Sequence, residues 1–404
     1  MIVLNFMVYI SSMSNPFFDT DDFDFESEKH KFIKNLDFLK SMSAEEQTFY
    51  KKWVEVQQLT NYINKSGVSK ARIWTPTDIN NQELTIKEIE QLKPTVVHVV
   101  DDPIDSDWIM LRTFCHTMEY AQTPGRFIKL LISDGNENNP RYLGVVSISS
   151  DVITITDRDK YIGWTAENKL EDKKLVYSAI GSCIMSTQPF GYNFLGGKLV
   201  AALVTSNATR KIWKDLYGQT LVGITTTSLY GSYSMYNSLK WWHKCGSSTG
   251  KMTIKPDDSV YNTWHQWIKD NKADEYKKAM TQKEGVNGPV TGAKNRVLSM
   301  IFQSLNIKTS NYTHGYERGV YYSCFYENSK EFLQNKIGEE QLKMKELFKR
   351  DSDAIMEWWR PKAIERYKKL KSEGNLKPDI LYYNKMIGMS YEEAKTNFFS
   401  EVGR

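Results

Sequence analysis

The segment Gln188–Lys198 (QPFGYNFLGGK) combines residue types that can bind a phosphate group. The first N–H groups of a helix have no partner within it, and glycines let an anion approach the backbone closely. A glycine-bearing loop that leaves a strand and opens a helix therefore favours a bound anion, and a lysine adds a positive charge. We expect a pyrophosphate-type donor site whose candidate residues are Gln188, Gly191, Gly196, Gly197 and Lys198.

The same segment differs from two well-known phosphate loops. A P-loop needs Ser or Thr directly after the lysine to hold Mg²⁺, but Leu199 follows Lys198 here, and the dinucleotide-binding fingerprint is also absent. Two consecutive glycines at the start of a helix also allow tight packing of that helix on a strand. The motif alone favours this simpler interpretation, and both remain open.

Cysteines and histidines give no metal motif. The four cysteines lie more than sixty residues apart, at Cys115, Cys183, Cys245 and Cys324. A zinc ribbon or knuckle needs paired sulfurs a few residues apart, so the spacing excludes it, and a reducing cytoplasm is the expected compartment. The six histidines are scattered, and no pair has metal-ligand spacing on a helix. A metal site assembled from distant residues stays open.

Alternating helix and strand patterns must position the loop. Apolar residues recur at helical spacing in 44–64 and again in 108–120, and two β-rich runs at 126–133 and 142–149 flank a turn-rich segment, which predicts a hairpin. We further expect a helix near 169–180, a strand over 183–188, a loop over 189–197, a helix from 195, a strand over 221–226 and a helix over 234–241. This order predicts an α/β fold with a central sheet and crossover helices.

Composition sets wider limits. The chain has 404 residues, a net charge of +4 and 40% hydrophobic residues, which is enough for a real core and too little charge to prove a nucleic-acid partner. No run of about 18 apolar residues suggests a membrane span, so we expect no membrane partner. The first twelve residues lack the features of a secretory signal, and Met13 reads as the natural start.

Several short motifs, taken in order, resemble the DruA-like family, which is named for a component of the Druantia anti-phage system. Arg158–Trp164 (RDKYIGW) resembles the family signature Arg-Asp-x-x-Ile-Gly-Trp, and it follows the strand near Tyr142–Ile148 in the family's order. Lys198–Leu203, the Trp213…Tyr217-Gly218 pair and Tyr230…Asn237 continue the match, which covers roughly 105–250.

DruA-like domains in turn resemble the phage DNA-modification protein Mom and the GNAT superfamily of acyl-CoA-dependent transferases. This resemblance implies a GNAT-like mixed sheet flanked by helices, an acyl-CoA or related donor whose pyrophosphate sits on the loop, and a splayed strand pair that receives the pantetheine arm. Gln188 and Gly191 keep the first half of the GNAT loop pattern, but Asn193 stands where a small residue is expected.

The resemblance also suggests two catalytic residues. His116 corresponds to the histidine of a His-Tyr pair in Mom-like proteins, although Thr117 follows it, and it would act as a base or an iron ligand. Tyr236 corresponds to the tyrosine by which many GNAT enzymes protonate the leaving thiolate. The simpler interpretations are a hydrogen-bonded histidine at a helix end and a core aromatic. Arg158, Asp159 and Trp164 are expected to hold the fold.

The resemblance and the patterns together divide the chain into five parts. These are a flexible acidic leader (1–30), a helical extension (31–100), a GNAT-like core (101–255), a polar helical connector (256–296), and an aromatic strand with a helical C-terminal region (297–404). The aromatic strand lies within Tyr321–Asn328, where it is expected to cover one face of the sheet, and the helix lies at Met356–Leu370. Basic residues at Lys343–Arg350 and Arg360–Lys371 could follow a phosphate backbone or form a solvated helix face.

Two functions follow from these observations. The preferred one is a phage-encoded or phage-related transferase that adds a small group to a nucleobase in DNA. The alternative is a non-catalytic DNA-binding or assembly component that keeps the fold but has lost the donor site, which the incomplete loop pattern favours. In both hypotheses the expected partner is DNA.

Overall fold

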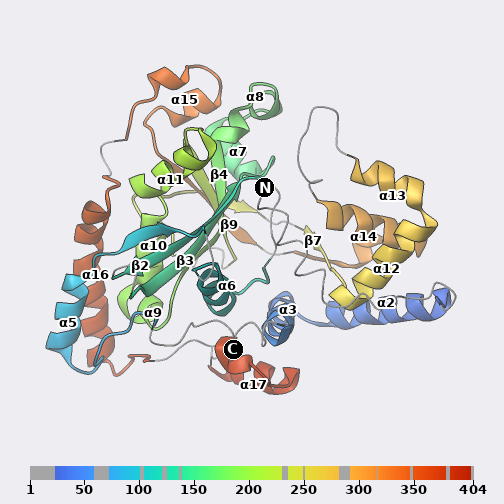
Figure 1. Ribbon diagram of the computed structural model, residues 1–404, viewed down its shortest axis with the longest axis horizontal. Helices are drawn as coiled ribbons and strands as arrows, with labels where there is room; N and C mark the ends of the chain where they lie inside the picture. The colour runs from blue at the N-terminus through green and yellow to red at the C-terminus, as the bar shows by residue number, and fades with distance from the viewer. Residues whose placement is uncertain are drawn as a thin grey trace. The chain divides into compact units, whose positions relative to one another are not determined.

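The computed structural model describes residues 23–58, 72–100, 104–120, 125–135, 139–229, 235–248, 251–281, 292–315, 317–345, 349–378 and 383–401. The chain divides into two compact units (Figure 1). The smaller unit comprises residues 1–43, 252–283 and 292–314, and the larger unit comprises residues 44–251, 284–291 and 315–404.

A seven-stranded mixed sheet forms the centre of the larger unit. Its strand order is β1-β2-β3-β4-β5-β9-β6. Every neighbouring pair is antiparallel except β4 and β5, which run parallel. The strands are β1 (Thr95–His98), β2 (Phe127–Asp134), β3 (Arg141–Ser150), β4 (Ser178–Ser186), β5 (Gly223–Ser228), β6 (His243–Ser248) and β9 (Arg318–Cys324).

Helices cover both faces of this sheet. Leu130 and Ile132 of β2 belong to the larger hydrophobic cluster, whereas Leu131 between them belongs to a second cluster around Trp108, as the alternation of a strand requires. The helices beside the larger cluster are α5 (Gln82–Gln91), α9 (Phe190–Phe194), α10 (Gly196–Leu203), α11 (Asn207–Tyr217) and α16 (Ser352–Ser372). On the opposite face, α6 (Ile104–Cys115) packs against the sheet. Helices α3 (Ala44–Gln58) and α17 (Tyr391–Glu401) pack beside α6.

Short elements complete the larger unit. They are α7 (Thr156–Ile162), α8 (Ala166–Leu170), α15 (Ser329–Leu333), and the 3-10 turns η3 (Lys174–Tyr177), η5 (Glu339–Gln341) and η6 (Tyr383–Met386).

Local sequence explains where the main helices start and stop. Ser206 caps α11 by accepting a hydrogen bond from the Thr209 N–H, and Gly218, with φ of 68°, ends it in the left-handed conformation that glycine adopts without strain. Asp351 caps α16 in the same way through the Ala354 N–H. These caps fix the lengths of two helices that pack on the sheet.

The smaller unit is built mainly from helices. An aromatic core holds it together, because Trp264 of α12 packs edge-on against Phe25 and Phe32 of α2, and Phe32 in turn contacts Phe302 of α14. Its elements are α2 (Phe25–Ser41), α12 (Asp258–Asn271), α13 (Ala273–Met280), α14 (Ala293–Ser304), η4 (Thr309–Asn311) and a two-stranded sheet of β7 (Lys251–Thr253) and β8 (Thr313–Gly315).

The hairpin and the α/β class are confirmed, while several expected elements are wrong. The helix near 169–180 is instead α8, a 3-10 turn and the start of β4, and the loop over 189–197 contains α9. Residues 235–238 form turns rather than part of a helix. In each case pairing or packing with distant segments overrides a local pattern.

Three expected boundaries also differ from the structure. Helix α2 starts at Phe25, inside the expected flexible leader, because Asp24 caps it through the Ser27 N–H; residues 1–22, including Met13, lie outside the described residues. The expected core of 101–255 leaves out β1 and β9, and β9 pairs between β5 and β6 instead of covering a face of the sheet.

Among the described residues, no helix has the length and apolar character to cross a bilayer.

Candidate functional site

The two parallel strands at the centre of the sheet pair over only part of their length. Residues Ser178–Gly181 of β4 pair with Gly223–Thr226 of β5. Beyond this point the rest of β4 stays bonded to β3, and Thr227 and Ser228 stay bonded to β9. We call the paired half the closed end, and we call Ser182–Ser186 together with Thr227–Ser228 the open end.

A β-bulge in β4 marks the change between the two ends. Gly181 pairs with Ile148 and Cys183 pairs with Ser147, so Ser182 is an extra residue in β4. A bulge bends the strand that carries it. The side chain of Ser182 is exposed, and its Oγ lies 2.8 Å from the Oγ of Ser147. The bulge therefore lies where the pairing of β4 with β5 ends, and it leaves polar atoms within reach of solvent.

A buried carboxylate holds the closed end together. Asp151 accepts hydrogen bonds from Ser178 Oγ of β4 at 2.6 Å, from Thr225 Oγ1 of β5 at 2.7 Å and from the Arg158 guanidinium at 2.6 Å. Arg158 is fully buried and also donates to Asp159, which pairs with Lys169 at 2.6 Å. The signature segment Arg158–Trp164 is therefore part of a network that joins the two strands.

The tryptophan of the signature belongs to the same support. Arg158 lies 5.1 Å from the Trp164 ring centre, and the Trp164 indole N–H donates to the Leu333 carbonyl at 2.7 Å. The side chains of Arg158, Asp159 and Trp164 contact other groups of the protein within the core. This placement agrees with the expectation that they hold the fold.

His116 lies directly after α6 and contacts the open end. Its ring nitrogens face the backbone of Met118, whose N–H lies 3.1 Å from Nδ1, and the backbone of Ser182. Burial, together with the positive charges of Arg112 and Lys52, lowers the pKa of His116 to about 3. The imidazole is therefore neutral at physiological pH and links the end of α6 to the bulge.

Sequence reasoning missed a buried charge cluster beside His116. Lys52 of α3 has no exposed surface and pairs with Glu55 at 2.6 Å, and Glu55 also contacts Arg112 of α6 at 3.3 Å and the Tyr120 N–H at 2.8 Å. Burial lowers the pKa of Lys52 to about 8. A usable signal was present, because Lys52 falls between Phe49 and Val56 on the buried stripe of its helix.

Tyr236 lies on the other side of the strand pair. It is in a turn, 5% exposed, and its ring packs against Trp242 and Tyr321 at centre distances of 5.1 Å. Its hydroxyl contacts the side chain of Thr226, the last β5 residue of the closed end, and burial raises the pKa of the phenol. His116 thus contacts β4 at Ser182, and Tyr236 contacts β5 at Thr226.

The expected phosphate loop has a different structure. After a cis peptide bond between Gln188 and Pro189, α9 forms and leads through Leu195 into α10. A Cβ on Gly196 would lie 2.3 Å from the ring of Phe190, so this ring fills the space beside the first residue of α10. A buried aromatic side chain therefore packs against Gly196, and the binding of an anion there stays a prediction.

The other predicted donor residues lie around this corner. Gly197 is half-buried, and a Cβ there would lie 3.1 Å from the sulfur of Met235. The Lys198 ammonium donates to the Asn237 carbonyl at 2.7 Å, and burial lowers its pKa. The Gln188 side chain accepts the Tyr192 N–H, and Gly191 lies against Ser186, the last residue of the open end. We call Gly197, Lys198 and Ser186 the donor corner.

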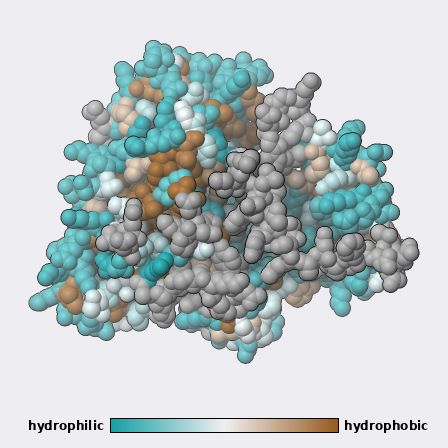
Figure 2. Space-filling view, viewed as in Figure 1, coloured by the Kyte–Doolittle hydropathy of each residue, from teal (hydrophilic) through white to brown (hydrophobic). Residues whose placement is uncertain are grey.

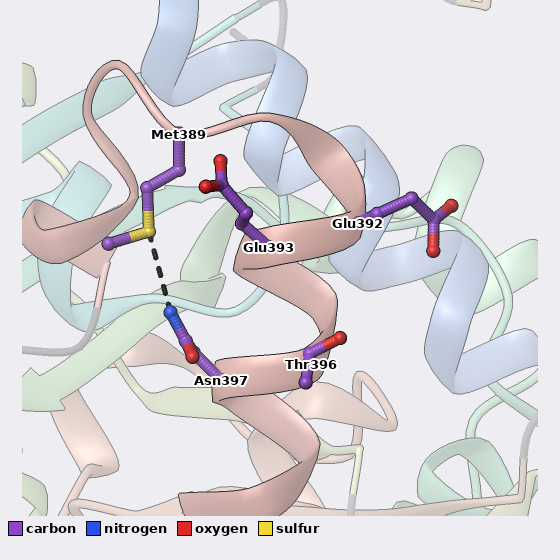
Figure 3. Close-up of a pocket in the computed structure, with 5 residues that line it drawn as sticks. All are labelled: Met389, Glu392, Glu393, Thr396 and Asn397. Atoms are coloured by element: carbon purple, nitrogen blue, oxygen red, sulfur yellow. Dashed lines mark hydrogen bonds between the residues drawn. The ribbon is translucent and has the colours of Figure 1, made fainter.

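A shallow pocket at the start of α17 contains none of these residues. Figure 3 shows Met389, Glu392, Glu393, Thr396 and Asn397, which line it. Glu393 accepts a hydrogen bond from the Ser390 N–H at 3.0 Å, and Asn397 donates to the Met389 sulfur at 3.7 Å. These contacts serve the helix start. In the part of the chain that the structure describes, no group of three or more His, Cys, Asp or Glu side chains could hold a metal ion.

Comparisons with known proteins identify the family. The sequence model of the family described as "Druantia protein DruA" matches residues 50–335. A curated protein of that name from Escherichia coli (strain UMEA 4076-1) is 25% identical over 296 residues, which cover 68% of this chain and 70% of the relative. No solved structure matches the chain. Because the match extends over most of the chain, this protein belongs to the DruA family.

Proposed function

We propose that this protein is a GNAT-like transferase that moves a small acyl or related group from a CoA-type donor to a nucleobase in DNA, as Mom-type proteins do. The observation that carries the proposal is the parallel strand pair with one bonded and one open end, which has Tyr236 and His116 against its two strands. The DruA relationship favours a role in defence against phage.

The open end suits an extended donor arm. The register between β4 and β5 ends at Gly181 and Thr226, so in the described residues the backbone of β4 beyond that point is not paired with β5. An unpaired strand edge accepts an extended partner through main-chain hydrogen bonds. A pantetheine arm carries amide groups of the same kind, and the donor corner at Gly197 and Lys198 would receive the phosphates that follow it.

The proposed reaction is an acyl transfer. The exocyclic amine of the base attacks the thioester carbonyl, the new C–N bond forms, and the C–S bond breaks. Tyr236 donates its proton to the departing thiolate, and the phenolate then takes the proton that the amine loses. A raised phenol pKa keeps Tyr236 protonated before the reaction. An enzyme cannot reach the amine of a base that is paired inside a duplex, so the target base must leave the base stack.

In this scheme His116 is a positioning residue. Its ring nitrogens face backbone groups of Met118 and Ser182, and its lowered pKa makes it a poor acceptor of protons near neutral pH. It would keep the bulge in place and so keep the strand pair open. Its action as a base or an iron ligand stays a prediction, which would require the contact with Ser182 to break.

Mass spectrometry of nucleosides tests the proposal. DNA from cells that express the wild-type chain should contain a new nucleoside, and DNA from cells with Tyr236→Phe should contain at least about a hundredfold less, the lower end of what general acid catalysis supplies. Tyr312→Phe is the matched control, because this hydroxyl bonds to Asp37 in the smaller unit. An unmodified nucleoside profile with the wild-type chain would remove the transferase.

One observation favours the second candidate, a DNA-binding or assembly component without catalysis. Phe190 fills the space beside Gly196, where a GNAT donor phosphate would approach the helix. Salt-dependent DNA binding, together with no thermal shift from acetyl-CoA or CoA, would support this candidate over the transferase.

A further inference from the structure

Several positively charged side chains lie against aromatic rings along one side of α16. Trp358, Lys362 and Arg366 are spaced i, i+4 and i+8, so they form one stripe on the helix, and about 12 Å separate its ends at 1.5 Å per residue. The Lys362 ammonium lies 5.6 Å from the Trp358 ring centre. The Arg366 guanidinium lies 5.2 Å from the ring centre of Tyr192 in α9.

Two more cations flank this stripe. Lys377 lies 5.1 Å from the same Tyr192 ring, and its backbone N–H is held by the Asn193 side chain at 3.1 Å. At the other end, Lys240 lies 4.7 Å from the Trp241 ring, which meets Trp358 edge-on at 5.0 Å. Cation–π contacts hold the positive groups on one side without neutralising them.

Three other basic residues of α16 have partners within the protein. Arg360 donates to the Leu92 carbonyl at 2.7 Å, and Lys371 donates to the Asn80 carbonyl at 2.6 Å, so both attach α16 to α5 and the segment before it. Lys369 pairs with Glu373. Among the described carboxylates, by contrast, none forms an ion pair with Lys362, Arg366 or Lys377. Glu365 is the acid nearest to the stripe in sequence, between Lys362 and Arg366.

The stripe runs toward the donor corner. Asn237, whose carbonyl accepts the Lys198 ammonium, lies in the same turn segment as Lys240 and Trp241. Helices α9 and α16 pack together, as Figure 1 shows, and the surface over α5 and α16 is mostly hydrophilic in Figure 2. A polyanion lying along the stripe would therefore lead to the donor corner.

We infer that Lys240, Lys362, Arg366 and Lys377 form a binding surface for the phosphate backbone of DNA, which we call the cationic stripe. The identity of the polymer rests on the proposed function. On α16 the two cations Lys362 and Arg366 lie about 6 Å apart along the helix axis, which corresponds to roughly two phosphates at the 3.4 Å spacing of one strand of a duplex. Ring-held cations are positioned before binding, so less side-chain entropy is lost when a phosphate arrives.

Binding of fluorescently labelled DNA at several salt concentrations tests the stripe. The full chain is compared with the variant Lys362→Ala, Arg366→Ala, Lys377→Ala, on a single-stranded and on a duplex oligonucleotide. Loss of three phosphate contacts should reduce the slope of log affinity against log salt by about 2 for a single strand, or by nearly 3 for a duplex. At low salt the affinity should fall at least about tenfold.

A control variant removes the same charge elsewhere. Lys211, Lys277 and Lys336 are exposed, and alanine at all three should leave the slope close to that of the wild type. Unchanged melting temperatures establish that both variants fold. The salt slope should fall in the stripe variant for the kind of oligonucleotide, single-stranded or duplex, that the stripe binds.

Three results would overturn the inference: a stripe variant that keeps the wild-type slope, a control variant that loses as much, or a wild-type chain that binds neither oligonucleotide. A chain that modifies DNA but whose stripe variant binds normally would keep the proposed function and lose this surface.

Discussion

The two ends of the β4–β5 strand pair are built from different kinds of buried charge. At the closed end, Asp151 joins both strands through Ser178 and Thr225 and is neutralised by Arg158. At the open end, a neutral His116 touches the bulge of β4, and Lys52 lies in the cluster beside it with a lowered pKa. Burial also raises the pKa of Asp151, so both ends hold an ionisable group away from its usual pKa, and the closed end differs in that its carboxylate joins the two strands directly.

The closed end should be the more sensitive of the two to substitution. Asp151→Asn leaves the shape almost unchanged but leaves the buried positive charges with one carboxylate fewer, so we expect a loss of about 3–5 kcal/mol in the free energy of unfolding. Urea denaturation measures this loss. Asp215→Asn removes the same charge from an exposed pair with Lys211 and should change stability by less than about 0.5 kcal/mol. Equal effects at the two positions would contradict a closed end held by Asp151.

The neutral state of His116 at the open end should change how the free energy of unfolding depends on pH under acid conditions. The folded-state pKa of His116 is about 3, below its usual 6.5, so the unfolded chain binds a proton that the folded chain does not. Stability is therefore lost as the pH falls below 6.5. Relative to His116→Gln, the wild-type chain should lose about 3 kcal/mol between pH 6.5 and pH 4.

Denaturation at a series of pH values measures this difference. His30→Gln, at an exposed position, should follow the wild-type curve. A His116→Gln curve parallel to that of the wild type over the whole range would mean that folding does not lower the pKa of His116.

A smaller effect is expected from Lys52 on the alkaline side. Its folded-state pKa of about 8 lies below the usual 10.5, so the folded chain releases this proton first, and stability rises with pH between these values. The wild-type chain should gain about 2 kcal/mol relative to Lys52→Met between pH 8 and pH 10. Lys51→Met, one residue earlier on the same helix, should show no such gain. A constant difference between wild type and Lys52→Met would contradict the burial of a charged lysine.

Local patterns predicted the elements that depend on local periodicity. The hairpin of β2 and β3 follows from two β-rich runs around turn residues, and α10 follows from the spacing of Leu199, Ala202 and Leu203. The start of β4 was missed because residues 178–180 acquire their conformation from pairing with β3 and β5. The position of β9 was missed because its partners lie about a hundred residues away in sequence.

The candidate site shows the same limit. The residues of the donor corner were found from glycine and lysine spacing, but no spacing reports that Phe190 packs on Gly196. The signature Arg158-Asp159 was recognised as a pair, whereas its partner Asp151 and the hydroxyls that Asp151 joins come from two strands that meet only in the fold. Contacts between distant segments therefore decide which candidate residues meet.

Hydrogen–deuterium exchange with and without acetyl-CoA or CoA tests the central claim most directly. If the open end binds the donor arm, amides of Ser182–Ser186 and Thr227–Ser228 should exchange more slowly with either compound, while those of Ser178–Gly181 and Gly223–Thr226 keep their rates. Unchanged exchange at the open end with saturating amounts of both compounds, or slowing confined to other parts of the chain, would contradict a donor site between β4 and β5.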